Sequence, residues 1–285
     1  MGALEDTLGD IAGKARFGLK RSVAAVAEST GIAPDALERL EGDAWVPEDD
    51  DTLVRLAGAL GLDAAKLVAV ARDRYRPSPV EDTTSPLRFA TLTVADQRGW
   101  TSNAHVAIWR DTGEAVLFDP GAEGDRLLTW LDGLGAKVRY IAVTHGHPDH
   151  WGGLARVREG TGAQVLIAKG DRHMVSGLNG QEQAVSGGER VPFGKAEIEV
   201  RSTTGHTPGG VSYVLPGAAF VGDSLFAGSL GRANVDYTAL VTGVGREILT
   251  LPDDTRLYPG HGPNTHVSDE RAHNPFYTPA TLPSR

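Results

Sequence analysis

The stretch THGHPDHWGG, residues 144–153, constrains this chain more than any other. It places His145, His147, Asp149 and His150 directly after the largely apolar run Val138–Val143. In a turn that follows a strand, ligands one residue apart can point at one centre, whereas the next Asp-His pair turns towards a second centre. The spacing therefore suits two adjacent metal ions better than one.

Three further potential ligands stand in similar settings, each next to a glycine and near the end of an apolar run. They are His206 in TTGHTPGG, Asp223 in AAFVGDSLF and His261 in RLYPGHGP. A histidine-rich surface turn that binds nothing is the alternative, and these repeated settings weigh against it. The chain contains no cysteine, so nitrogen and oxygen must hold any metal. Such ligands suit zinc and also admit iron or manganese.

Composition limits the remaining classes of protein. Of the 285 residues, 40% are hydrophobic and 23% are charged, which is typical of a globular chain with a substantial core. The net charge of -9 disfavours polyanion binding by the molecule as a whole. No run of about 18 apolar residues is present. We therefore expect a cytoplasmic protein that does not associate with membranes.

The chain divides at PSPVEDTTSP, residues 77–86, whose three prolines favour an extended linker. Before it, residues 1–76 show Ala and Leu at helical spacing, with Ser22 and Asp51 or Thr52 placed to cap helices. Gly31, Gly42 and Gly61 are placed to end them. After it, residues 87–285 alternate β-rich runs with Gly-rich turns and a few amphipathic segments. We predict a small all-α domain followed by an α/β domain.

Within the first part, SVAAVAESTGIAPDALERLEGD and DTLVRLAGALGLDAAKL resemble the lambda-repressor-like helix-turn-helix domains over about residues 11–72. The resemblance implies a first helix over Val23–Ser29, a turn at Gly31 and a recognition helix over Pro34–Leu40. The apolar positions that would build the small core by themselves are Val26, Ala27, Ile32, Leu37, Leu40, Leu53, Leu56 and Leu60.

DNA binding would require donors on that recognition helix and a basic surface. The positions facing base edges would be Ala33, Pro34, Asp35, Ala36 and Glu38. Up to residue 79, ten basic residues meet fourteen acidic ones, a net charge of -4. A protein-contact role is therefore favoured, either homodimerisation or a lid over an active site. The basic cluster Lys14, Arg16, Lys20 and Arg21 keeps DNA binding open as the alternative.

Residues 87–276 resemble the metallo-β-lactamase-fold hydrolases, and all seven metal-ligand positions of their dinuclear pattern are filled. EAVLFDPGA also resembles the family's early strand that ends in Asp-Pro-Gly. The resemblance implies an αββα sandwich with its site on loops at one edge of the sheets. It further implies that His145, His147 and His206 hold a first metal, that Asp149, His150 and His261 hold a second, and that Asp223 bridges them.

Two divalent ions so held can share a water, lower its pKa and present hydroxide to a carbonyl carbon. Asp149 would then orient the hydroxide or pass a proton to the leaving group.

The segments GDSLFAGSLGRANVDY and LPDDTRLYPGHGPNTHVSDERAHNPF resemble the glyoxalase II-like group, which includes thioester hydrolases and persulfide dioxygenases. Only 24 residues follow His261, so the carboxy-terminal helical extension that supplies glutathione contacts in the longer enzymes is not expected. The intact second site, with PGHG, favours hydrolysis over the single-iron dioxygenase chemistry. We predict a dinuclear hydrolase of thioesters or similar activated acyl bonds, with a metal-bridging hydroxide as nucleophile.

Three alternatives stay open at this point. They are persulfide dioxygenase-like activity, lactone or phosphoester hydrolysis, and a DNA-binding transcriptional regulator whose metallohydrolase domain senses or clears an effector.

Candidate contacts for the small acyl substrate are Trp100, Trp151, Arg232, Asn234 and Tyr237. The two tryptophans are equally compatible with core positions, and Arg232 with a surface salt bridge. The remaining histidines, His105, His173, His266 and His273, are expected to be structural.

Overall fold

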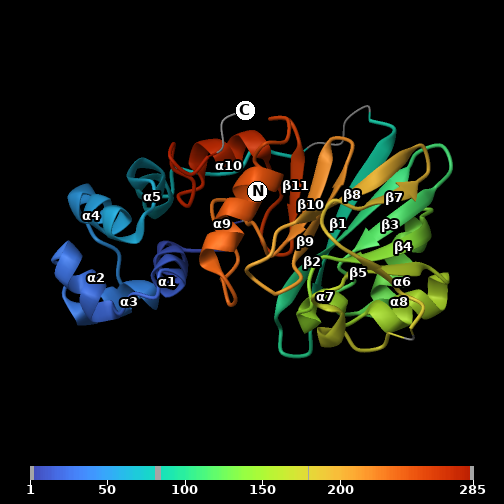
Figure 1. Cartoon of the computed structure of the whole chain (residues 1–285), viewed down its shortest axis with the longest axis horizontal. Helices are drawn as coiled ribbons and strands as arrows, with labels where there is room; N and C mark the ends of the chain where they lie inside the picture. The colour runs from blue at the N-terminus through green and yellow to red at the C-terminus, as the bar shows by residue number, and fades with distance from the viewer. Residues whose placement is uncertain (1–2, 81–84, 179, 283–285) are drawn as a thin grey trace.

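The computed structural model describes residues 3–80, 85–178 and 180–282. Over these ranges the chain forms two six-stranded sheets packed face to face, with helices outside each sheet and a further group of N-terminal helices beside them (Figure 1). The predicted sandwich is therefore confirmed.

The first sheet has the strand order β1-β2-β3-β4-β5-β6. β1, β2 and β3 pair antiparallel, and β3 to β6 pair parallel. The bounds are β1 Leu87–Ala95, β2 Thr101–Trp109, β3 Glu114–Phe118, β4 Lys137–Val143, β5 Gln164–Ala168 and β6 Gln183–Val185.

The second sheet has the order β12-β11-β10-β9-β8-β7. Its neighbours pair antiparallel, except that β10 and β11 are parallel. The bounds are β7 Arg190–Phe193, β8 Ala196–Ser202, β9 Val211–Leu215, β10 Ala218–Gly222, β11 Arg256–Pro259 and β12 Thr265–His266.

Three apolar layers hold the sandwich together. One lies between the sheets and includes Phe118, Tyr213 and Phe220. A second lies between the first sheet and the helices α6 and α8, and a third covers the outer face of the second sheet under α9 and α10. The helices are α6 Gly124–Gly133, α7 Pro148–Trp151, α8 Leu154–Thr161, the 3-10 turn η1 Arg172–Met174, α9 Tyr237–Glu247 and α10 Val267–His273.

Five helices occupy the predicted helical region: α1 Leu8–Gly18, α2 Val23–Thr30, α3 Pro34–Glu41, α4 Asp50–Leu60 and α5 Ala64–Ala71. The first strand begins at Leu87. Residues 77–80, 85 and 86 of the predicted linker have no helix or strand, and residues 81–84 lie outside the described residues. The exact domain boundaries remain a prediction.

Local capping explains most of these helix limits. Ser22 caps α2, and Gly31, Gly42 and Gly61 end α2, α3 and α4 as predicted. The start of α4 was predicted at Asp51 or Thr52, and this was wrong. Asp49 caps the helix instead, because its carboxylate accepts the Thr52 backbone N–H at 2.7 Å and the Thr52 hydroxyl at 3.0 Å.

The helical region shares its core with the sandwich. The eight predicted core positions are all buried. They do not form a core by themselves, because the same buried cluster continues through Leu240, Val244, Phe276 and Tyr277 of the outer layer. The five helices therefore extend that layer, with α1 beside α9 and α5 beside α10 (Figure 1).

Polar contacts fix this arrangement. The Lys66 ammonium donates to the backbone oxygens of Arg271 at 2.8 Å and Tyr277 at 2.5 Å. Lys14 forms an ion pair with the buried Asp6 and donates to the Leu230 carbonyl at 2.9 Å. Such buried donors cost free energy when they lose their partners, so these bonds specify one docking geometry.

No helix among the described residues is both long and apolar enough to cross a bilayer.

Glu270 lies fully buried at the contact between α10 and the segment that follows α5. Its carboxylate accepts from the Tyr75 hydroxyl at 2.9 Å, Thr265 Oγ1 at 2.8 Å, the Gly228 N–H at 2.9 Å and Asn274 Nδ2 at 2.8 Å. Burial raises the pKa of Glu270 to about 7, against these hydrogen bonds, which lower it.

We predict that Glu270 makes stability fall as pH rises. Its folded pKa exceeds the ordinary 4.5, so the folded state keeps a proton that the unfolded state releases. Its contribution is complete below about pH 4.5 and lost above about pH 7. Denaturant unfolding at both limits should show the wild type losing on the order of 2–3 kcal/mol relative to Glu270→Gln. The amide fits because its N–H groups can donate to the two hydroxyls. An equal pH dependence in both proteins would contradict this assignment.

Candidate metal centre

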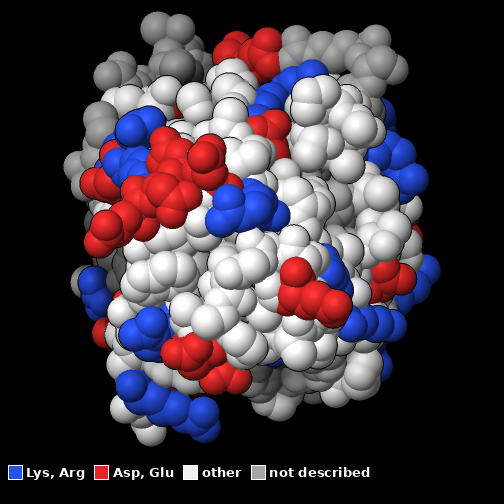
Figure 2. All heavy atoms as spheres, turned by 90° about the vertical axis from the view of Figure 1, so that its left-hand side faces the viewer, with Lys and Arg blue, Asp and Glu red and all other residues white. Residues whose placement is uncertain are grey.

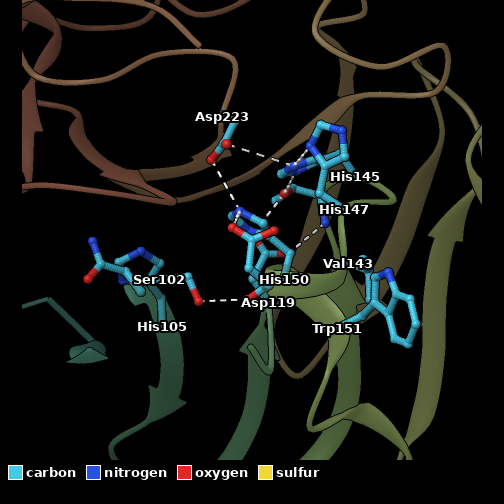
Figure 3. Close-up of polar contacts among 12 residues, drawn as sticks. Ser102, His105, Asp119, Val143, His145, His147, His150, Trp151 and Asp223 are labelled. Atoms are coloured by element: carbon cyan, nitrogen blue, oxygen red, sulfur yellow. Dashed lines mark hydrogen bonds and ion pairs between the residues drawn. The ribbon is translucent and has the colours of Figure 1, made fainter. Parts of the chain in front are cut away.

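The seven predicted ligands meet at one edge of the sandwich, on loops at strand ends. The first four follow β4, His206 lies between β8 and β9, Asp223 follows β10 and His261 follows β11. Figure 3 shows His145, His147, His150 and Asp223 pointing towards one another from these loops. His147 directly precedes α7 without a side-chain capping bond, and Pro148 at the first helical position sets the backbone that turns Asp149 and His150 away from the first pair.

The first group consists of His145, His147, His206 and Asp223. His147 Nδ1 lies 3.1 Å from His145 Nε2 and 2.9 Å from His206 Nε2. The second group consists of Asp149, His150 and His261. Asp149 Oδ2 lies 3.5 Å from His150 Nε2 and 3.3 Å from His261 Nε2.

Asp223 touches both groups. Its Oδ2 lies 3.6 Å from His206 Nε2 and 3.5 Å from His261 Nε2, and its Oδ1 lies 3.2 Å from His150 Nε2. The structure thus places this carboxylate between the two groups, where the bridging ligand was predicted. Gly260 permits the approach, because a Cβ there would lie 2.3 Å from Asp223 Oδ1 and 2.4 Å from His150 Cε1.

In four of the histidine rings, the nitrogen that faces away from the centre has a hydrogen-bond acceptor in the protein. Nδ1–H of His206 donates to the Arg232 carbonyl at 2.6 Å, and that of His261 to the Thr101 carbonyl at 2.7 Å. Nδ1–H of His150 donates to Asp119 Oδ2 at 3.0 Å, and His145 Nδ1 lies 3.1 Å from the Thr144 hydroxyl. The four Nε2 atoms therefore face the centre, and each can give its lone pair to a metal ion when its ring is neutral.

Electrostatics also fits cations here. His150 Nε2 and Asp223 Oδ1 are buried without a hydrogen-bond partner among the described residues. Burial lowers the pKa of His145 well below its ordinary range and lowers that of His206, so both rings stay neutral. Burial lowers the pKa of His261, but the negative charge of the neighbouring Asp223 raises it more, to about 10. The protonated ring of His261 thus balances the negative charge of the carboxylates beside it. A divalent cation can take the place of that proton.

Asp119 was not among the predicted site residues. It follows β3 in the Asp-Pro-Gly turn, at a backbone φ of 50°, and it is fully buried. Its Oδ1 accepts the Thr144 N–H at 2.8 Å, and its Oδ2 accepts the Thr144 hydroxyl at 2.7 Å as well as His150 Nδ1. Asp119 therefore orients ligands of both groups. Its sequence signal was the Asp-Pro-Gly of EAVLFDPGA, which resembles the family's early strand but predicted no role for the aspartate itself.

Asp171 is a second residue that the sequence did not reveal. It is fully buried just before η1, and its two carboxylate oxygens accept the Gly146 N–H at 2.8 Å and the Gly209 N–H at 2.6 Å. Gly146 separates His145 from His147, and Gly209 belongs to the loop that carries His206. Asp171 therefore joins the two loops that form the first group.

The predicted substrate contacts have different environments. Trp151 donates from its indole to the Gly146 carbonyl at 2.9 Å and so supports the ligand turn (Figure 3). Trp100 is 66% exposed in the loop between β1 and β2. Arg232 and Asn234 are exposed and Tyr237 is half-buried, all on the segment before or at the start of α9. His105 is buried between Thr91 and the Pro259 carbonyl, which fits a structural role.

The family model for the metallo-beta-lactamase superfamily matches residues 98–261. The chain belongs to this superfamily, in agreement with its two sheets and its His/Asp groups able to bind metal ions.

Individual relatives match a similar part of the chain. A probable metallo-hydrolase, YqgX, of Bacillus subtilis is 32% identical over 61% of this chain and 92% of its own length. The hydroxyacylglutathione hydrolase GloC of Haemophilus influenzae is 29% identical, over 59% and 90%. The persulfide dioxygenase ETHE1 of Mus musculus is 33% identical, over 59% and 68%. The crystal structure of the B3 metallo-beta-lactamase BLEG-1 superposes with a TM-score of 0.60 at 32% identity, covering 66% of this chain and 99% of that one.

We expect Asp223→Ala to lose at least one metal ion, because the Asp223 carboxylate lies within 3.6 Å of Nε2 atoms of both groups. Elemental analysis of metal-loaded protein measures this directly. Asp132→Ala, on the exposed face of α6, is the control and should keep the wild-type content. Full occupancy in the Asp223 variant would contradict the bridging assignment.

Asp171 orients the ligand loops but is not itself a predicted ligand. Asp171→Asn should therefore weaken metal binding about tenfold, as is usual for residues that orient metal ligands. An amide accepts one of the two backbone N–H groups and turns its own donor towards the other. Competition with a chelator gives the affinity. Asp49→Asn, which changes a capping carboxylate on α4, is the matched control. Unchanged affinity would mean that the ligand loops hold their geometry without Asp171.

Proposed function

We propose that this protein is a dinuclear metal-dependent hydrolase of thioesters or similar activated acyl bonds. The observation that carries the proposal is the position of Asp223 between two groups of donors, each sufficient for one ion. His145, His147 and His206 would hold the first ion, Asp149, His150 and His261 the second, and Asp223 both. Zinc suits these ligands best, and iron or manganese fits as well.

When bound, two such ions supply an activated water at neutral pH and Lewis-acid polarisation of the carbonyl oxygen. The protein's own residues then fix the geometry. Asp119 and Thr144 orient the rings of His150 and His145, and Asp171 fixes the turn between His145 and His147. Three carboxylates lie near the centre, and Asp149 is more exposed than Asp119 or Asp223. Asp149 is therefore best placed to hold a proton of the attacking water and pass it to the leaving thiolate.

The proposed substrate class rests on the similarity to named relatives and on the second group of candidate metal ligands. Relatives named as hydroxyacylglutathione hydrolases match much of the chain's α/β part, and that name supports an acylated thiol as the substrate class. The persulfide dioxygenase relative keeps the alternative open. The complete second group of Asp149, His150 and His261 favours hydrolysis, because it offers a place for a second ion.

Hydrolysis of a small thioester panel, S-lactoylglutathione included, tests this proposal. A chromogenic disulfide reagent reports the released thiol, and the absence of cysteine in the chain means that the signal comes from substrate alone. We expect turnover by the metal-loaded wild type and a loss of about a hundredfold or more in Asp149→Ala, with Asp132→Ala unaffected. Absence of turnover with full metal content would contradict thioester hydrolysis and direct the search to lactones, phosphoesters and persulfides.

A further inference from the structure

A cleft of about 600 Å³ separates the end of α1 from the segment that leads into α9. Phe17, Lys20 and Arg21 line one wall, and Asn234, Val235 and Tyr237 line the other. The helical region thus supplies half of this cleft, and the α/β part supplies the rest.

The cleft adjoins the first group of metal ligands. Arg232 contributes to both places, since its carbonyl accepts His206 Nδ1–H at 2.6 Å and its guanidinium carbon lies 4.1 Å from the centre of the Phe17 ring. The N–H groups of Val235 and Asp236 donate to the Gly205 carbonyl at 2.9 and 3.1 Å, directly beside His206. The cleft and the first group of ligands therefore share the segment from Arg232 to Asp236.

The charge of the cleft comes from cations with different availability. Arg16 is paired with Glu41 through two bonds, and Arg21 donates to the carbonyls of Ala59 and Ala25. Lys20 and the guanidinium of Arg232 take part in no ion pair or donated hydrogen bond within the described ranges. Both are exposed. The donors of these two residues are therefore free to bind an anion.

The anionic groups nearby are already engaged. The Asp236 carboxylate caps α9 by accepting the Ala239 N–H at 2.9 Å, and Glu41 holds Arg16. Apolar surface lies between the charges, with Phe17 42% and Val235 55% exposed. The cleft thus combines free cations with uncovered apolar side chains.

The same contacts disfavour duplex DNA as the partner of these cations. Of the basic cluster that kept DNA binding open, Lys14, Arg16 and Arg21 are engaged inside the protein, which leaves Lys20. On the predicted recognition helix α3, Asp35 and Glu38 are exposed. Figure 2 shows acidic groups interspersed with basic ones on the outer face of the helical region. A continuous basic surface for a phosphate backbone is not visible on that face.

We propose that this cleft binds the leaving group of the substrate, a thiol that carries negative charge as carboxylate or phosphate, and that Lys20 is a specificity-determining residue contributed by the helical region. The inference rests on the proposed thioester hydrolysis. The acyl carbonyl lies at the metals, the thiol portion follows Arg232 into the cleft, and Lys20 binds its anionic end while Phe17 and Val235 cover its apolar part.

Equilibrium binding tests the cleft without catalysis. The probes are S-methylglutathione, which carries carboxylates, and S-methyl-coenzyme A, which carries phosphates; neither has a free thiol to bind metal. We expect at least one to bind the metal-loaded wild type, with about tenfold weaker binding to Lys20→Glu, the size of one charged hydrogen bond. The probe that shows the loss identifies the anion. Lys137→Glu, at the opposite end of β4 from the ligand turn, should bind as the wild type does.

Kinetics separates the two proposals. A thioester of neutral N-acetylcysteamine with the same acyl group should have the same kcat/KM in the wild type and in Lys20→Glu, whereas kcat/KM for the anionic thioester should fall about tenfold. If both thioesters are hydrolysed and Lys20→Glu changes neither, the cleft proposal is wrong while thioester hydrolysis stands. If the probes bind in a Lys20-dependent way but no thioester is hydrolysed, the cleft is an anion-binding site and the proposed thioester hydrolysis is wrong. Failure of both probes to bind, or Lys20-dependent binding of duplex DNA in their place, would overturn the cleft proposal.

Discussion

The carboxylate of Asp223 is the constraint on which the rest of the structure depends. It is buried at the end of β10 and faces four histidine rings from three separate loops. Burial opposes its ionisation, yet the neighbouring imidazolium charges of His150 and His261 hold its pKa well below the ordinary range. A buried anion of this kind is stable only with positive charge beside it. The sheets, turns and orienting residues around it serve to keep that charge in place.

The orienting groups form a continuous scaffold from the first sheet to the centre. Asp119 at the end of β3 bonds to Thr144 after β4, and Thr144 in turn contacts His145. The parallel pairing of β3 and β4 brings these two strand ends to one edge. Because both strands are buried, their ends have little conformational freedom. The sheet therefore fixes the positions of the side chains that follow these strands.

The candidate ligands could be located from sequence because each stands near the end of an apolar run in a recurring chemical setting. His145, Asp223 and His261 all obey this rule. The roles of Asp119 and Asp171 were not predicted, because an aspartate gives no local sign of which distant groups will donate to its carboxylate. The helices were predictable from periodicity and glycine positions, except where consecutive acids at 48–51 offered several caps for α4. The place where the helical region docks depends on tertiary contacts such as Lys66 with Tyr277, which no local pattern encodes.

The bonds of Lys66 join residues 205 and 211 positions apart, so the helical region packs against the last helix of the described chain. Closing so long a loop has an entropic cost that must be met before the contact contributes stability. During synthesis the five helices emerge early, while the surface that covers their apolar side, on α9 and α10, emerges late. We therefore expect docking of these helices to be a late step in folding, with their hydrophobic face uncovered until then.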